Sequence, residues 1–535
     1  MSEVARDRLI HRIKRLNAIG TALSAERDHD HLLEHILLGA KELTNADGGS
    51  LYILCDDTLH FMLVHTTSLN LHMGGSSGKP IGFPPIALHD ENSAPRRHMV
   101  VTRAALENSI INIPDAYSDT EFDLSGTRAF DSNTGYRSQS LLAVPMQDHE
   151  GHIIGVLQLI NATGDDGSTI PFTHEDESLV ASLASQAAVT LNRQHLIDGL
   201  QTLLQSLTRL IANAIDDKSP HTAGHCRRVP EITMALAQAI NQDDSPEFKG
   251  TTFSEQALEE LEMAAWLHDC GKITTPEYVI EKHTKLEAII DRIQLVDARL
   301  ELMELEAEVL AGADSALPES SGSYSRLPTR EELVEIRDFL HRCNTGGEFL
   351  PEEDQQRLRE IASLTTLPHG DNPARPLLTE EELAHLSIPK GTLSDEERQQ
   401  INNHAAVTMR MLNAVPFPDH LSQVPLIACS HHERMDGKGY PKGIPAGDLP
   451  LQARILAIAD IFEALTASDR GYREPMPLSK TLTILAYMCN EGHIDPQLYR
   501  LFLKHEVYAD YAQKFLKPEQ IDDVDATAIS SILKQ

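Results

Sequence analysis

The sequence has few cysteines, and those it has are far apart. The six residues form no C-x-x-C pair, which argues against a disulfide framework and a structural zinc site and favours a reducing compartment. Long apolar runs are also missing. No stretch approaches the roughly 18 residues that a membrane span needs, and the charged start is typical of an amphipathic helix rather than a signal peptide. We therefore expect a soluble, cytoplasmic protein that does not bind membranes. The cysteines are Cys55, Cys226, Cys270, Cys343, Cys429 and Cys489.

Basic residues are scarce as well. Lys and Arg number 46 against 80 Asp and Glu, which gives a formal net charge of -34. A surface of this charge repels nucleic acids and anionic lipids, so neither is an expected partner. A phosphorylated substrate would have to be drawn in by metal ions or by a few well-placed cations.

The chain of 535 residues is long enough for two or three domains. Residues 1–195 have an α+β pattern: the helical stretch LLEHILLGAKELTNAD precedes strand-like runs at SLYIL, LHFMLVHT, SLLAVPM and HIIGVLQLIN. Residues 174–214 then repeat apolar positions every three or four residues, over more length than most globular helices have. This pattern predicts a coupling helix that pairs with a second copy, and therefore a homodimer.

From about residue 200 to 520 helical periodicity dominates and predicts an all-α domain. An interruption at about 286–390 contains 22 acidic and 10 basic residues and no cluster of possible ligands. We predict an acidic helical insertion here, with a long helix over IEKHTKLEAIIDRIQLVDARLELMELEAEVLAG and another over TREELVEIRDFLHRC. Gating of a site, binding of a partner and a tolerated surface excursion all remain open for it.

Residues of metal-ligand type occur in five separated stretches: HTAGHCRRV, WLHDCGK, INNHAAV, SHHERMDG and ILAIADIFEAL. Each alone has an ordinary alternative, because a lone histidine on an amphipathic helix usually lies on the surface or in the core, and GKGYPKG alone predicts a turn. Together, imidazole and carboxylate donors suit Fe, Mn or Zn better than Ca or Mg. The candidates are His221, His225, His268, Asp269, Lys272, His404, His431, His432 and Asp460.

The His268-Asp269 pair carries a spacing argument. Adjacent helical residues point about 100° apart, so the histidine can serve one metal while the two-oxygen carboxylate bridges to another. Two metal ions held close together by a shared carboxylate are the usual arrangement for displacing a phosphoester. Lys272, one turn after His268, would reach the same face and could hold a phosphate oxygen.

Five stretches of the chain resemble, in their order, the HD-GYP family of HD-superfamily phosphohydrolases. They are DDKSPHTAGHCRRV, AAWLHDCGKITTPEYVI, GTLSDEERQQINNHAAVTMRML, HHERMDGKGYPKGI and LPLQARILAIADIFEALTASDRGYR. The resemblance implies a metal-dependent hydrolase domain over residues 200–520 that converts cyclic di-GMP to linear pGpG, with the further step to GMP open. Two alternatives are cleavage of 3′,3′-cyclic GMP-AMP instead and an inactive receptor or scaffold. The full set of ligands favours the enzyme.

The resemblance also implies roles for residues. Two divalent transition metals, Fe or Mn, would be held by His225, His268, Asp269 and Asp460 and by Asp269, His404, His431 and His432. Asp269 and Lys272 would be catalytic, and Lys272, Tyr440, Arg470 and Arg473 would contact the substrate. Glu433 and Asp436 would orient ligands and loop. His221 stands where some members have a Glu for a third metal, and Glu463 where the family commonly has Asp, so a third metal and a substrate contact at these positions stay open.

The N-terminal half resembles a GAF domain over about residues 20–190. The stretches that carry this resemblance are LLEHILLGAKELTNADGGSLYIL, INIPDAYSDTEFD, TGYRSQSLLAVPM, GVLQLINA and FTHEDESLVASLASQAAVTL. The resemblance implies a sensor of an unknown small molecule that regulates the hydrolase, and a purely structural dimerisation domain is the alternative. In family members that bind cyclic nucleotides, a Lys follows the position of Asn161 and forms an ion pair with the acid at the position of Asp176. This chain has Ala162 there, which makes a cyclic nucleotide a less expected ligand, although Phe172 and Glu177 also match.

Overall fold

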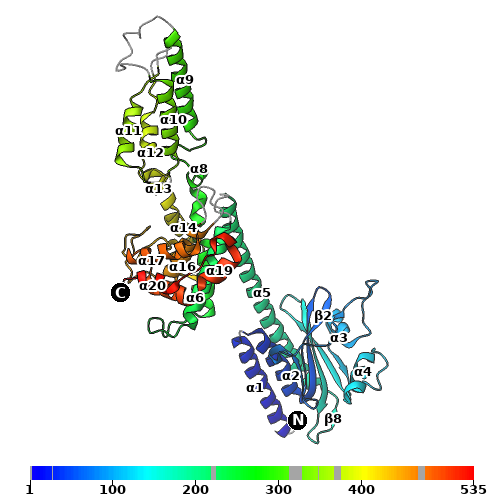
Figure 1. Ribbon diagram of the computed structural model, residues 1–535. Coiled ribbons are helices and arrows are strands. Elements are labelled where there is room, and N and C mark those ends of the chain that lie inside the picture. The colour runs from blue at the N-terminus through cyan, green and yellow to red at the C-terminus, as the bar shows by residue number, and fades with distance from the viewer. Residues whose placement is uncertain are drawn as a thin grey trace. The chain divides into compact units, whose positions relative to one another are not determined.

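The computed structural model describes residues 3–26, 28–218, 224–312, 328–346, 349–366, 375–467 and 476–534. The chain divides into two compact units, Met1–Leu203 and Leu204–Gln535, and each is described by itself (Figure 1). His221, Arg470 and Arg473 lie outside the described residues. No described helix combines the length and the apolar character needed to cross a bilayer.

The first unit is built on an antiparallel sheet of order β3-β2-β1-β7-β6-β5, with β4 beside β2 and β8 beside β7. The four runs predicted as strands are β1, β2, β6 and β7, so the α+β prediction is confirmed. The strands are β1 Ala46–Cys55, β2 Thr58–Thr66, β3 Leu71–Gly74, β4 Ile86–Ala87, β5 Ile111–Ile113, β6 Leu141–Gln147, β7 Ile153–Thr163 and β8 Thr169–Ile170.

Helices cover both faces of this sheet. The amphipathic spacing of α2 (His29–Thr44) buries Leu33 and Leu37 against Leu157 of the central strand β7, in one core with residues of α1 (Glu3–Ala25) and α5 (His174–Lys218). A second core on the other face includes residues of α3 (Val100–Glu107), and α4 (Ser125–Thr134) lies nearby (Figure 1).

Asp176 has an ion-pair partner from another helix, although Ala162 stands where some GAF domains have a lysine. Arg12 of α1 donates to a carboxylate oxygen of Asp176, and at 2.9 Å to Glu175. Asn161 is also engaged, since its carbonyl oxygen accepts from the backbone N–H of Gln139 at 2.7 Å. These motif residues therefore hold the first unit together rather than face a ligand.

The long helix predicted over 174–214 is present as α5, His174–Lys218. Its beginning contributes Val180 and Leu183 to the core of the first unit, and its end contributes Ala212 and Ile215 to the core of the second. Between these ends one stripe of large apolar side chains is exposed. Its members, Leu196, Leu200, Leu203, Leu207 and Leu210, are 47% to 65% exposed.

The second unit is helical, as predicted. Its main core is formed by apolar side chains from α5 to α7 and α14 to α20. The helices outside the insertion are α6 His225–Gln242, α7 Glu255–Leu267, α8 Glu277–Ile280, α13 Asp395–Asn402, α14 His404–Leu412, α15 Val424–Cys429, α16 Leu451–Thr466, α17 Leu478–Asn490, α18 Pro496–Lys504, α19 Val507–Phe515 and α20 Ala526–Ile532.

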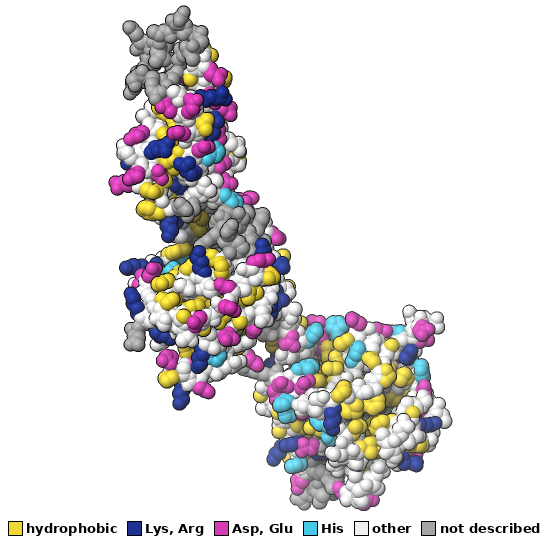
Figure 2. Space-filling model, viewed as in Figure 1, with side chains coloured by type: hydrophobic (Ala, Val, Ile, Leu, Met, Phe, Trp, Pro, Cys, Tyr) yellow, Lys and Arg dark blue, Asp and Glu magenta, His cyan; other side chains and the backbone are white. Residues whose placement is uncertain are grey.

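The insertion has a small apolar core of its own, which includes Leu300, Phe339 and Leu358. Figure 2 shows acidic and basic side chains mixed over its visible face. Its helices are α9 Ile293–Gly312, α10 Arg330–Asn344, α11 Glu352–Ala362 and α12 Glu380–Leu386.

One helix prediction in the insertion is wrong at its start. The helix expected from about residue 280 begins only at Ile293. Before it, Glu287 accepts a hydrogen bond from the backbone N–H of Thr284, and Asp291 accepts one from the Thr284 hydroxyl. Lys285 donates its backbone N–H to Asn344 of α10. These local and tertiary bonds compete with the helical ones and keep the segment a loop.

Candidate metal centre

The candidate ligands of the second unit converge from the ends of several helices. His225 and His404 are the first residues of α6 and α14, and His268 directly follows α7. Asp460 lies within α16. All four are buried, with 0% to 8% of their surface exposed.

Three of the histidines are oriented by the helix that precedes each of them in the chain. In each ring Nδ1 bonds the backbone carbonyl three residues earlier, so Nδ1 carries the proton and Nε2 presents a lone pair to the centre. The bonds are His268 Nδ1 to Ala265 O at 2.8 Å, His404 Nδ1 to Ile401 O at 2.6 Å and His431 Nδ1 to Ala428 O at 2.6 Å.

The inward nitrogens form two close pairs. Nε2 of His225 lies 3.3 Å from Nε2 of His268, and Nε2 of His404 lies 3.4 Å from Nε2 of His431. Where both nitrogens are acceptors, such a pair repels unless a cation lies between or beside them. The histidines thus form two groups, His225 with His268 and His404 with His431. In each group the metal-binding nitrogens face a common point.

Asp269 lies between the two groups. Its Oδ2 is 3.4 Å from Nε2 of His225 and 3.4 Å from Nε2 of His268. Its Oδ1 is 3.3 Å from Nε2 of His404 and 3.9 Å from Nε2 of His431. Oδ1 is buried and accepts no hydrogen bond from a described residue. One carboxylate therefore offers a separate oxygen to each group.

Asp460 and His432 extend the two groups. Oδ1 of Asp460 is 3.2 Å from Nε2 of His225, and its Oδ2 is 3.9 Å from Nδ1 of His432. The His432 ring also lies beside Tyr440, with 4.7 Å between ring centroids. Within each of two sets, His225 with His268 and Asp460, and His404 with His431 and His432, the donor atoms lie within 4.8 Å of one another.

Both carboxylates of the centre are ionised at neutral pH. Burial raises the pKa of Asp269, but Lys272, whose Nζ is 2.5 Å from Oδ2, and the nearby histidines hold that pKa well below its usual range. Burial also raises the pKa of Asp460, but the hydrogen bond from His225 and the other surrounding histidines together hold that pKa well below its usual value. Ionised carboxylates are the form that binds metal.

The histidines differ in their preferred charge. Burial lowers the pKa of His431 well below its usual value and that of His432 to about 3, so both are neutral. Burial also lowers the pKa of His225, but Glu463 and other carboxylates around it raise this pKa well above the usual value. A positive charge is favoured at that position, and a divalent cation supplies it as well as a proton does.

These observations fit a metal centre. The buried Oδ1 of Asp269 lacks a partner that a divalent cation would supply, and the paired imidazole nitrogens face one another across the same space. Mixed nitrogen and oxygen donors are typical of transition metals. The buried His and Asp clusters are thus consistent with the metal site of an HD domain.

Two glycines allow the close approaches on which the centre depends. A Cβ at Gly271 would lie 2.0 Å from the carbonyl oxygen of His404, so only glycine lets this turn touch α14. A Cβ at Gly439 would lie 2.5 Å from the Cα of Glu433. The Glu433 carboxylate accepts from the backbone N–H of Lys442 at 2.7 Å, which ties the Gly-Tyr-Pro loop to the histidine turn.

Sequence reasoning missed three supporting side chains, Thr408, Lys218 and Arg228, and left the partner of Glu463 open. Thr408 accepts from the N–H of Gly271 at 2.9 Å and donates to the carbonyl of His268 at 3.1 Å. Lys218 donates to the carbonyl of Thr275 at 2.6 Å. Arg228 and Glu463 form an ion pair beside His225. The last pair had a signal, since each lies one helical turn from a candidate ligand, His225 or Asp460.

Comparison with protein families agrees with this architecture. A model described as GAF domain matches residues 28–191, and two described as HD domain match residues 222–341 and 380–498. The chain contains a GAF domain followed by an HD domain. The two HD matches leave residues 342–379 uncovered, and these lie within the insertion of the HD domain.

Curated relatives match only part of the chain. A probable cyclic di-GMP phosphodiesterase of Vibrio cholerae is 42% identical over 141 residues, 25% of this chain and 32% of that protein. A 3′3′-cGAMP-specific phosphodiesterase 3 of the same species is 36% identical over 115 residues, 21% of this chain and 24% of that protein. The chain thus spans about a quarter to a third of these relatives.

Solved structures resemble the GAF domain. The alignment with the GAF domain of an Acinetobacter phosphoenolpyruvate-protein phosphotransferase covers 37% of this chain and 99% of that solved chain, with 16% identity and a TM-score of 0.26.

Proposed function

We propose that the protein is a metal-dependent phosphodiesterase of the HD-GYP type that opens cyclic di-GMP to linear pGpG. The main support is the position of Asp269, whose two oxygens face two separate histidine groups. This is the geometry that a bridging ligand between two metal ions requires. The partial likeness to cyclic-dinucleotide phosphodiesterases adds the substrate class.

The chain's own residues would hold the metals and orient the phosphate. His225, His268 and Asp460 would hold one ion, His404, His431 and His432 the other, and Asp269 both. When bound, two divalent ions, Fe or Mn, would act as Lewis acids at the phosphoester. A third ion would depend on His221.

Lys272 would keep a positive charge beside the phosphate. Burial lowers its pKa, but Asp269, with a smaller contribution from Asp460, helps raise it above the usual value, so the ammonium stays charged. Its side chain is 22% exposed, which lets it reach a bound anion. Tyr440, next to His432, would border the substrate, and Arg470 and Arg473 would hold its other phosphate.

The test is product chromatography with the Mn- or Fe-loaded protein, prepared without oxygen, on cyclic di-GMP and 3′,3′-cyclic GMP-AMP in parallel. We expect metal-dependent linear product from cyclic di-GMP. Product from cyclic GMP-AMP alone would keep the enzyme and change its substrate. No product from either, with both metals bound, would contradict the enzyme and favour a receptor.

We further propose the division into a GAF sensor over 1–195, a coupling helix over 174–214 and a hydrolase over 200–520, joined in a homodimer. The exposed stripe of α5 supports the dimer. Its leucines alternate steps of four and three residues from Leu196 to Leu210, which is the heptad spacing of paired helices. The stretch 189–211 has only three charged side chains, Arg193, Asp198 and Arg209, so two copies of this acidic protein can approach along it.

The GAF domain offers a pocket of about 390 Å³. Phe61 lies between Tyr52 and Phe83 with centroid distances of 4.5 and 5.4 Å, and Phe130 continues the row. No Lys, Arg or His is among the described lining residues, and Asp123 adds a carboxylate. An anion would find no counter-charge in this pocket, so we propose that the pocket takes an uncharged aromatic ligand. We further propose that this ligand changes the turnover of the hydrolase through α5.

Dye binding tests this pocket in the full-length protein. The uncharged aromatic dye Nile red is expected to gain fluorescence with the wild type and to lose most of the gain in Phe130→Lys. Phe515→Lys, at an exposed phenylalanine of α19, is the control. Cyclic AMP and cyclic GMP are expected not to displace the dye. Displacement by either nucleotide would contradict an uncharged ligand.

A further inference from the structure

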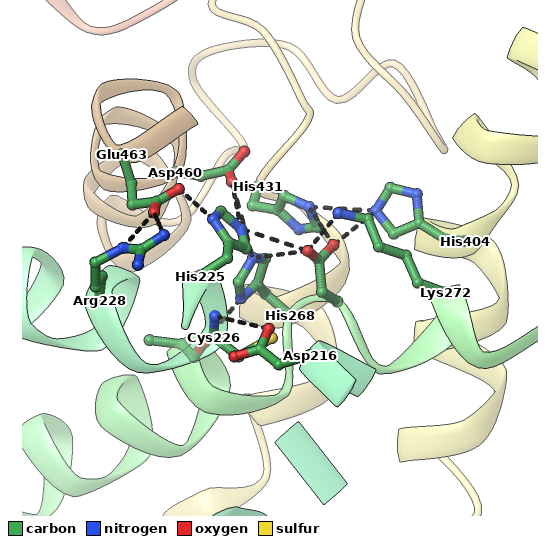
Figure 3. Close-up of polar contacts among 12 residues, drawn as sticks. Asp216, His225, Cys226, Arg228, His268, Lys272, His404, His431, Asp460 and Glu463 are labelled. Atoms are coloured by element: carbon green, nitrogen blue, oxygen red, sulfur yellow. Dashed lines mark hydrogen bonds and ion pairs between the residues drawn. The ribbon is translucent and has the colours of Figure 1, made fainter. Parts of the chain in front are cut away.

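Glu463 lies behind His225, on the side away from the other ligands (Figure 3). It is completely buried. One carboxylate oxygen accepts from Nδ1 of His225, and the other accepts from Nε of Arg228 at 2.7 Å. We propose that Glu463, held by Arg228, is a positioning residue that sets the ring orientation and tautomer of His225, and that one of the two metal positions depends on it.

His225 differs from the other three histidines in the partner of its Nδ1. His268, His404 and His431 each bond the carbonyl three residues earlier. His225 is the first residue of α6, and the acceptor of its Nδ1 proton is Glu463, which comes from another helix, α16. A carboxylate accepts this hydrogen bond more strongly than a carbonyl does and makes Nε2 a better ligand.

Two helices supply the arrangement through side chains one turn apart. On α6, His225 and Arg228 share a face, and on α16, Asp460 and Glu463 share a face. Asp460 lies 3.2 Å from Nε2 of His225 while Glu463 holds Nδ1, so α16 contacts both ring nitrogens. Glu463 is thereby turned away from solvent, which argues against the direct substrate contact left open by the sequence.

Glu463→Gln is the sharpest test. A glutamine has one acceptor oxygen, and the guanidinium of Arg228 will hold it. The amide NH₂ then faces Nδ1, which forces the His225 proton onto Nε2 and removes its lone pair. We expect Mn²⁺ affinity to fall about 10- to 100-fold at one of two sites and to stay unchanged at the other. Equilibrium dialysis with metal analysis measures this without substrate.

A second substitution separates the tautomer from simple loss of packing. In Glu463→Gln with Arg228→Met the amide oxygen is free to turn toward Nδ1, so most of the lost affinity is expected to return. A double variant that binds no better than the single one would overturn the tautomer mechanism. Glu382→Gln is the matched control, because Glu382 is also buried and pairs with an arginine, Arg299 at 2.7 Å, in the insertion.

The outcome is readable even if the glutamine variant folds poorly. Glu463→Asp keeps the charge opposite Arg228 but shortens the side chain by one methylene group, so it is expected to weaken the same single site. Wild-type affinity at both sites in folded Glu463→Asp or Glu463→Gln, judged by circular dichroism, would overturn the proposal. The inference rests on the proposed function only through His225 as a ligand. Absent hydrolysis with a weakened site would therefore count against the phosphodiesterase and not against Glu463.

Discussion

Asp269→Asn is expected to lower cyclic-dinucleotide hydrolysis by at least about 10³-fold and to leave less than one tightly bound metal per chain. The physical reason is the division of labour between the two oxygens. Oδ1 faces His404 while Oδ2 faces His225 and His268. Asparagine keeps one oxygen and replaces the other by an NH₂ group that cannot bind a cation, and it also removes the negative charge that Lys272 balances.

Metal analysis and product chromatography on the same preparation check this result. Asp510→Asn removes an exposed carboxylate from α19 of the same unit and is expected to change neither quantity. If folded Asp269→Asn kept both metals and full turnover, the bridging role would be wrong. Loss of turnover with both metals retained would instead assign Asp269 a role in orienting Lys272 alone.

Leu200→Glu combined with Leu207→Glu is expected to convert the proposed homodimer into monomers. Each leucine contributes roughly 1.5 to 3 kcal/mol when buried, and a dimer loses four of them while four carboxylates meet in one seam. The dimer dissociation constant should therefore rise by at least about 10³-fold. Glutamate preserves helix propensity, so α5 itself should persist. Sedimentation velocity at micromolar concentration measures the change.

The control places the same charges on another face of the same helix. Gln201 and Thr202 are exposed and lie outside the leucine stripe, so Gln201→Glu with Thr202→Glu is expected to remain dimeric. A wild-type protein that is already monomeric at micromolar concentration would refute the pairing of α5. Dissociation of both double variants would show that added negative charge, rather than the seam, is decisive.

The elements that the sequence predicted well are those with strong local periodicity. The strands that became β1, β2, β6 and β7 alternate or concentrate apolar residues between clear turns, and α5 repeats its apolar positions without interruption. The segment before Ile293 has the same helical character but forms a loop, because side chains of Glu287 and Asp291 bond locally and Asn344 captures the backbone. A local pattern does not reveal such a competitor.

Periodicity and side-chain chemistry are local properties, and they were enough to predict the α+β and all-α halves, the long helix between them, the types of residue available for a metal centre and a bridging Asp269. The packing of the folded chain sets the rest: which histidines each oxygen of Asp269 faces, that Arg12 pairs with Asp176, and that Glu463 turns to His225. Each of these contacts joins residues distant in sequence, and a direction in space between two helices is set by the packing of a whole core.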